Sequence, residues 1–124
     1  MQAGVRMEEY KVQMFIKSFK EAAKEKVIQY DLKRKSTIYL REIGWTPREM
    51  LDYVCANLSV NTYSIGPTLH HNGSGHNVMV FGIFFEQQLL YVKLSYGENG
   101  SGACMSFHPN EKEMEFPYRK DGVE

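Results

Sequence analysis

Residues 89–109, LLYVKLSYGENGSGACMSFHP, hold two runs of alternating side chains on either side of a glycine-rich turn. Successive side chains of a β-strand point to opposite faces of the sheet. One face of both runs is therefore almost wholly apolar: Leu90, Val92, Leu94 and Tyr96, with Ala103, Met105 and Phe107. The other face is mainly polar: Leu89, Tyr91, Lys93 and Ser95, with Cys104, Ser106 and His108. The pattern predicts an antiparallel hairpin with one buried and one exposed face.

The register of this hairpin decides which polar groups meet. If the turn 97–102 closes symmetrically, Tyr96 pairs with Ala103, Lys93 lies opposite Ser106, and Tyr91 lies opposite His108. Side chains directly opposite each other are about 5 Å apart at Cβ, and diagonal ones about 7–8 Å. A phenol, an ammonium and an imidazole would then be able to reach one bound phosphate.

Helical periodicity dominates the first half of the chain. Apolar residues recur every three or four positions over residues 8–26, which predicts an amphipathic helix. Ser36 is a suitable N-cap for a second helix that Gly44 would end. Thr46-Pro47-Arg48-Glu49 has a threonine cap, proline at the first helical position and glutamate three residues after the cap, so it predicts the start of a third helix.

Strand signals flank and follow these helices. Residues 27–32 form a weak candidate for a short strand, and residues 77–85, NVMVFGIFF, predict a central strand in which Gly82 marks a bulge or a close approach. Residues 57–75 are rich in turn formers and predict a long loop. The expected fold is α+β, with the N-terminal helices packed on one face of a small antiparallel sheet of three to four strands.

Composition indicates one domain spanning residues 1–124, with residues 1–7 and 120–124 as mobile ends. The chain has 43% apolar residues, yet it has no apolar segment of membrane-spanning length and no apolar centre of a signal peptide near its start. We therefore expect a cytoplasmic protein without a membrane partner. Cys55 and Cys104 lack a metal-binding or redox spacing and are expected to be reduced residues in or near the core.

Charge is distributed unevenly along the chain. Residues 1–62 carry eleven Lys or Arg and eight Asp or Glu, a formal +3, whereas residues 63–124 carry four and seven, a formal −3. The densest basic run is Lys33-Arg34-Lys35. This run is typical of a solvated helix start, and phosphate contact is the functional alternative.

Three histidines, His70, His71 and His76, lie in the predicted loop. Their spacing permits a metal site, but no Cys or carboxylate accompanies them, so further ligands would have to come from elsewhere. Contact with RNA through one of these imidazoles, and simple exposure on a loop, are the two other interpretations.

Five short segments carry a recognisable order and spacing. They are LREIGWTPRE at 40–49, LSVNTYSIGP at 58–67, VMVFG at 78–82, YVKL at 91–94 and MSFHP at 105–109. Together they resemble the MqsR family of bacterial type II toxins, over roughly residues 12–118. The resemblance implies a RelE-like fold and a metal-independent endoribonuclease that cleaves single-stranded messenger RNA. It also implies a cognate antitoxin partner of the helix-turn-helix type and no cofactor.

Carried over residue by residue, the resemblance places the family's YxK tyrosine and lysine on Tyr91 and Lys93, and a basic position on His108. These three are the predicted catalytic residues. The predicted substrate-binding residues are Tyr63, Ser106, His76 and Arg119, and no metal ligands are predicted. The sequence departs from the family at Met79, where a tryptophan is frequent, and at Ser64, where some members have lysine.

The expected chemistry is attack by an RNA 2′-hydroxyl on the adjacent phosphate. It requires a base, an acid and a cation to offset the developing charge. Imidazole titrates nearest neutrality, so His108 suits the acid or the base. Lys93 supplies the cation, and Tyr91 either donates a hydrogen bond to a phosphate oxygen or orients the imidazole. The departures at Met79 and Ser64 favour the alternative, a non-catalytic module that binds protein or RNA on a toxin-like fold.

Overall fold

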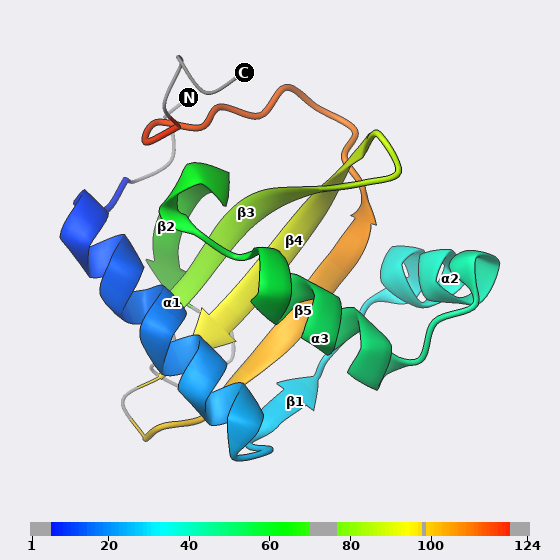
Figure 1. Cartoon of the computed structure of the whole chain (residues 1–124), viewed down its shortest axis with the longest axis horizontal. Coiled ribbons are helices and arrows are strands. Elements are labelled where there is room, and N and C mark those ends of the chain that lie inside the picture. The colour runs from blue at the N-terminus through cyan, green and yellow to red at the C-terminus, as the bar shows by residue number, and fades with distance from the viewer. Residues whose placement is uncertain (1–5, 70–76, 98, 120–124) are drawn as a thin grey trace.

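The computed structural model describes residues 6–69, 77–97 and 99–119, which form an α+β fold. The elements in chain order are α1 (Glu9–Lys24), β1 (Ile28–Tyr30), α2 (Arg34–Ile43), α3 (Pro47–Asn57), the 3₁₀ turn η1 (Val60–Thr62), β2 (Tyr63–Leu69), β3 (Asn77–Phe85), β4 (Gln88–Tyr96) and β5 (Gly102–Pro109). Helices α1 and α3 cross one face of the sheet, while α2 lies beside β5 (Figure 1). The predicted α+β class is confirmed. The placement of helices on one face holds for α1 and α3, whereas α2 lies beside β5 (Figure 1).

The sheet is larger than predicted and is mixed, with five strands in the order β1-β5-β4-β3-β2. Strand β1 confirms the weak strand signal at residues 27–32, but it pairs with β5 in parallel. The expectation of a purely antiparallel sheet of three to four strands is therefore wrong. Partners so distant in the sequence leave no local signal of their orientation.

Strand β2 occupies part of the segment that was predicted to be a loop. It pairs antiparallel with β3 through an irregular register that shifts between Tyr63 and Ile65 and again between Ile65 and Thr68. Proline lacks an N–H group and is confined in sheets to edges and bulges, so Pro67 is compatible with this edge strand. The Gly-Pro pair explains why the segment resembles a loop.

Strand β5 contains a one-residue bulge at Met105. Lys93 pairs with Ser106 and Tyr91 with His108, as predicted, but on the turn side of the bulge Leu94 pairs with Cys104 and Tyr96 with Gly102. The predicted Tyr96–Ala103 pair is therefore wrong. The bulge also reverses the faces near the turn: Cys104 joins the core under the helices, while Ala103 and Met105 pack with Val78 in a separate small cluster.

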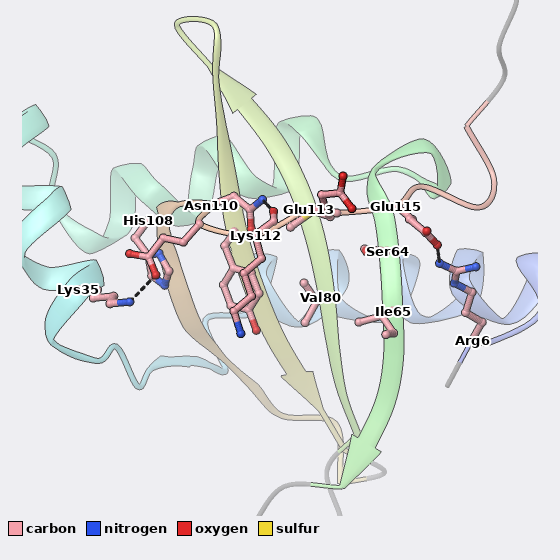
Figure 2. Close-up of a pocket in the computed structure, with 13 residues that line it drawn as sticks. Arg6, Lys35, Ser64, Ile65, Val80, His108, Asn110, Lys112, Glu113 and Glu115 are labelled. Carbon is pink, nitrogen blue, oxygen red and sulfur yellow. Dashed lines mark hydrogen bonds and ion pairs between the residues drawn. The ribbon is translucent and has the colours of Figure 1, made fainter. Parts of the chain in front are cut away.

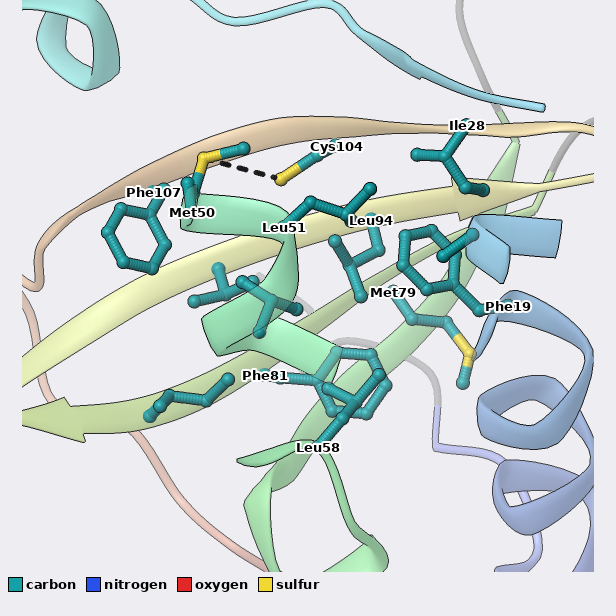
Figure 3. Packing of buried hydrophobic residues seen from close by; sticks show 14 of the residues in the cluster. Phe19, Ile28, Met50, Leu51, Leu58, Met79, Phe81, Leu94, Cys104 and Phe107 are labelled. Atoms are coloured by element: carbon teal, nitrogen blue, oxygen red, sulfur yellow. Dashed lines mark hydrogen bonds between the residues drawn. The ribbon is translucent and has the colours of Figure 1, made fainter. Parts of the chain in front are cut away.

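The main core lies between the sheet and helices α1 and α3. Figure 3 shows Phe19, Leu51, Leu58 and Phe81 meeting there, with the sulfur atoms of Met50 and Cys104 at 3.9 Å. The six apolar residues of α1 that recur every three or four positions are all buried: Val12, Phe15, Ile16, Phe19, Ala22 and Ala23. Both cysteines are free; Cys104 is buried and Cys55 half-buried, which confirms their prediction as reduced residues.

Two of the helix-end predictions hold and one does not. The Thr46 hydroxyl accepts the Glu49 N–H at 3.1 Å, and the Glu49 carboxylate accepts the Thr46 N–H at 2.9 Å. Gly44 ends α2 in the left-handed conformation at φ +76°. The N-cap of α2 is Lys33, however, and Ser36 lies within the helix.

Ser36 links α2 to β5 through a buried hydrogen bond. Its side chain is fully buried, and its hydroxyl accepts the N–H of Phe107 at 2.7 Å. Strand β1 pairs with β5 only as far as Cys104, so it offers no backbone acceptor to the N–H of Phe107. The Ser36 hydroxyl accepts this hydrogen bond in place of a neighbouring strand. The available sequence signal was the position of Ser36, three and four residues before Tyr39 and Leu40, on the apolar side of the helix.

The segment 110–119 returns across the face of the sheet opposite α1 and α3. A Cβ atom at Gly82 would overlap Met114 Sδ and the Phe116 ring, so glycine leaves the space that this segment occupies. Of the two interpretations of Gly82, the close approach is confirmed, because β3 and β4 pair there without a register shift.

The predicted mobile ends fall partly outside the description. Residues 1–5 and 120–124 lie outside the described residues. Of the predicted mobile end 1–7, Arg6 and Met7 are described. Arg6 forms a parallel bridge with Gly66, the Met7 N–H donates to the Tyr63 hydroxyl, and the Met7 carbonyl accepts from the Tyr118 hydroxyl. Among the described helices, none combines the length and apolar character needed to cross a membrane.

The Ser36 contact yields a prediction about stability. Ser36→Ala leaves the buried Phe107 N–H without its acceptor, so we expect the free energy of unfolding to fall by about 1–3 kcal/mol in urea denaturation. The matched control is Thr37→Ala, which removes a neighbouring exposed hydroxyl and should change stability by no more than about 0.5 kcal/mol. Equal effects of the two substitutions would contradict the role assigned to Ser36.

Candidate functional site

Tyr91 and His108 form the centre of the candidate site. They are directly opposed on β4 and β5, on the face turned away from α1 and α3. Their rings are stacked, with centroids 5.3 Å apart and planes inclined by 23°. On β3 the matching position is Gly82, so no side chain from that strand competes for the space beside Tyr91. The structure thus brings together two of the three predicted catalytic residues.

One nitrogen of the His108 ring is engaged by the backbone. Nδ1 lies 3.0 Å from the carbonyl oxygen of Pro109. Because a carbonyl oxygen only accepts, this hydrogen bond requires the hydrogen on Nδ1. The neutral ring then has its lone pair on Nε2, for which the described residues provide no hydrogen-bond partner. Such an imidazole can accept a proton at Nε2 and later return it.

Lys93 and Ser106 form the adjacent cross-strand pair on the same face. Residues two apart on a strand are separated by about 7 Å, so Lys93 is a near neighbour of Tyr91. The lysine side chain is half-buried and makes no ion pair within the described part of the chain. Ser106 is 7% exposed, so only a small part of this predicted substrate-binding residue reaches the surface.

Tyr91 remains a hydrogen-bond donor at neutral pH. The side chain is half-buried, and this burial raises the pKa of its phenol above the ordinary value of 10.0. Loss of water disfavours the charged phenolate. The phenol therefore keeps its proton and is able to donate to an anion.

A hollow of about 560 Å³ lies between this face of the sheet and the returning segment 110–115. Tyr91, His108, Val80 and Ile65 line it on the sheet side. Figure 2 shows Asn110, Lys112, Glu113 and Glu115 on the segment that passes across the strands, with Lys35 at one end and Arg6 at the other. Cations and carboxylates therefore lie around Tyr91 and His108, whereas Lys93 does not line this hollow.

Two of the predicted substrate-binding residues lie elsewhere. Tyr63 is fully buried; its hydroxyl accepts the Met7 N–H and donates to the Gly66 carbonyl at 2.5 Å. This burial does not fit the prediction of Tyr63 as a substrate-binding residue. Arg119 is exposed, lies over the Phe116 ring and lines a separate hollow with Phe84.

The predictions for the loop histidines fall outside the structure's description. His70, His71 and His76 lie among residues 70–76, so neither the RNA contact nor the metal hypothesis can be placed. Within the described ranges, no group of three His, Cys, Asp or Glu side chains is arranged to hold a metal ion.

Of the two positions at which the chain departs from the MqsR pattern, one lies in the core and the other lines the hollow. Met79 is fully buried in the main core, so its side chain does not face the hollow. Ser64 is 6% exposed and lines the hollow. Of the two departures, Ser64 is the one in a position to alter contacts with a ligand.

Two cations lie at the edge of the site. Lys35 belongs to the basic run for which phosphate contact was the functional alternative, whereas sequence reasoning missed Arg6. Lys35 pairs with Glu111 and Arg6 pairs with Glu115, each at 2.6 Å. The basic run 33–35 was the available signal for Lys35, whereas nothing in the sequence around Arg6 distinguished it. Both contacts depend on the path of the segment 110–115.

Comparison with protein-family models, with curated proteins and with solved structures found no match to this chain.

The burial of Tyr91 yields a prediction about its titration. In ultraviolet absorbance, the difference between the wild-type titration and that of Tyr91→Phe should show a phenol with a midpoint above pH 10, because burial disfavours the phenolate. The same difference recorded in denaturant should have its midpoint near pH 10. A folded-state midpoint at or below 10 would show that Tyr91 is solvated.

Proposed function

We propose that this protein is a metal-independent endoribonuclease that cleaves single-stranded RNA at the Tyr91–His108 face of the sheet. The observation that carries the proposal is the stacked Tyr91–His108 pair, whose imidazole has Nδ1 engaged and Nε2 available, with Lys93 on the same face. This reaction requires a base, an acid and a cation. His108 supplies one of the two proton-transfer groups, Lys93 the cation, and Tyr91 a neutral hydrogen-bond donor.

In the proposed reaction, the 2′-oxygen of one nucleotide attacks the adjacent phosphorus and the bond from phosphorus to the 5′-oxygen breaks. The products are a 2′,3′-cyclic phosphate and a 5′-hydroxyl. One proton leaves the 2′-hydroxyl and one is delivered to the departing 5′-oxygen. His108 Nε2 exchanges one of these protons and solvent water exchanges the other, so the two transfers balance. Lys93 offsets the charge on the phosphorane, and Tyr91 donates a hydrogen bond to a phosphate oxygen.

The proposal also includes a role as a toxin and a partnership with an antitoxin protein. Resemblance to the MqsR family supports the toxin of a type II toxin–antitoxin system, with a RelE-like fold and messenger RNA as substrate. The α+β architecture with helices on one side of the sheet is compatible with such a fold. A neighbouring reading frame that encodes a small helix-turn-helix protein would support the antitoxin partnership.

The test is cleavage of a long single-stranded RNA in EDTA at low ionic strength. Wild-type protein should produce fragments with 2′,3′-cyclic phosphate ends. His108→Ala should lower the rate about 10²–10⁴-fold because a proton-transfer group is lost, and Lys93→Ala about 10²–10³-fold because charge stabilisation is lost. The control Lys17→Ala removes an exposed lysine of α1 and should leave the rate unchanged.

Two results would remove the assignment. One is RNA left intact by the wild-type protein. The other is cleavage that His108→Ala and Lys93→Ala do not diminish. Binding of the RNA without cleavage would instead support the second candidate, a non-catalytic RNA-binding module.

A further inference from the structure

The segment 110–118, here called the tail, places three carboxylates beside the candidate site. Every second residue from Glu111 to Glu115 is a glutamate, and all three glutamates line the hollow that contains Tyr91 and His108. This face is the one on which the phosphates of an RNA strand would lie under the proposed function. The protein thus presents its own anions where the anions of a substrate are expected.

Ion pairs hold the acidic part of the tail at both ends. Glu111 accepts from Lys35 of α2 and Glu115 accepts from Arg6, each at 2.6 Å, as the dashed lines in Figure 2 mark. The hydrogen bond from Lys35 lowers the pKa of Glu111, so this carboxyl stays ionised at neutral pH. The two cations flank the hollow and are both engaged by the tail.

Apolar contacts fix the tail independently of these charges. Met114 and Phe116 fill the space over Gly82, and the Tyr118 ring stacks on Tyr63 with centroids 5.9 Å apart. The Tyr118 hydroxyl also donates to the Met7 carbonyl at 2.6 Å. The carboxylates are therefore kept next to Lys35 and Arg6 at high local concentration.

The ion pairs themselves are exchangeable. The side chains of Lys35 and Arg6 are 62% and 41% exposed, and their partners are more than half exposed. Ion pairs of this kind contribute little because water and salt screen them. A polyanion that offers several phosphates, and releases counterions on binding, is able to displace them.

We propose that Lys35 and Arg6 are phosphate-binding positions at the two ends of the site, and that Glu111 and Glu115 of the tail compete with single-stranded RNA for them. The inference rests on the proposed function for the identity of the strand. It adds two binding residues and an intramolecular competitor that lowers the affinity of the resting protein.

The test measures binding alone, by fluorescence anisotropy of a labelled 2′-O-methyl single-stranded RNA, which lacks the attacking hydroxyl. Glu111→Gln/Glu115→Gln frees both cations, so the affinity should rise roughly 3- to 30-fold at low salt. Two additional phosphate contacts should also steepen the slope of log affinity against log salt by about 1.4.

The matched control carries the same change in net charge. Glu21 and Glu25 are exposed, do not line the hollow and make no ion pair among the described residues. Glu21→Gln/Glu25→Gln should therefore raise the affinity less than about twofold and leave the salt slope unchanged. Equal gains in the two double variants would overturn the proposal, because only general charge would then matter.

Removal of a cation gives a second, independent result. Lys35→Gln should change affinity less than about twofold in the wild type, where Glu111 engages the lysine. The same substitution should cost at least about fivefold when added to Glu111→Gln/Glu115→Gln. An equal cost in both backgrounds would overturn the competition between Glu111 and RNA.

These results are separable from the ribonuclease test. Selective tightening without any cleavage by the wild type would support the phosphate positions and remove the enzymatic assignment. Cleavage that depends on His108, with tail variants that bind like the control, would do the reverse. No binding by any variant would overturn both.

Discussion

The one-residue bulge at Met105 is the constraint on which both faces of the sheet depend. Near the turn, Leu94 pairs with Cys104; continued without a bulge, this register would place His108 opposite Leu90, whose side chain lies in the core under the helices. The extra residue instead places His108 opposite Tyr91 on the other face. It also lets Cys104 and Phe107, three residues apart, both pack beneath the helices. Bulges commonly reorient side chains in this way next to functional sites.

The two faces are therefore built from different interactions. Beneath α1 and α3, apolar packing dominates, and the polar contact of Ser36 with Phe107 satisfies a donor that the strands leave unpaired. On the opposite face, Tyr91, Lys93 and His108 are only partly covered. Apolar anchors and exposed ion pairs hold the tail over Tyr91 and His108. This second face thus combines polar side chains with a small apolar cluster and with the apolar anchors of the tail.

Sequence reasoning identified the features that depend on near neighbours. The capping box at Thr46, the stripe of α1 and the pairing of Tyr91 with His108 follow from local spacing. The pairing of Tyr91 with His108 was predicted correctly although the assumed pair at the turn, Tyr96 with Ala103, was wrong. The bulge adds one residue to β5, and this residue restores the predicted register beyond it. Partners remote in the sequence were missed: parallel β1, the edge strand β2 with its Gly-Pro pair, and the Lys35 and Arg6 contacts. Tyr63 was predicted to bind substrate, yet it is buried and packs against Tyr118 and Phe81.

The central claim is that single-stranded RNA occupies the face of the sheet opposite α1 and α3. The most direct measurement is a titration of isotope-labelled protein with a 2′-O-methyl single-stranded RNA, followed by nuclear magnetic resonance shifts of the amides and of the His108 ring nitrogens. The account predicts the largest changes at Tyr91, Lys93, His108 and the tail, with α1 little affected. Changes confined to the exposed face of α1, with His108 unmoved, would contradict it.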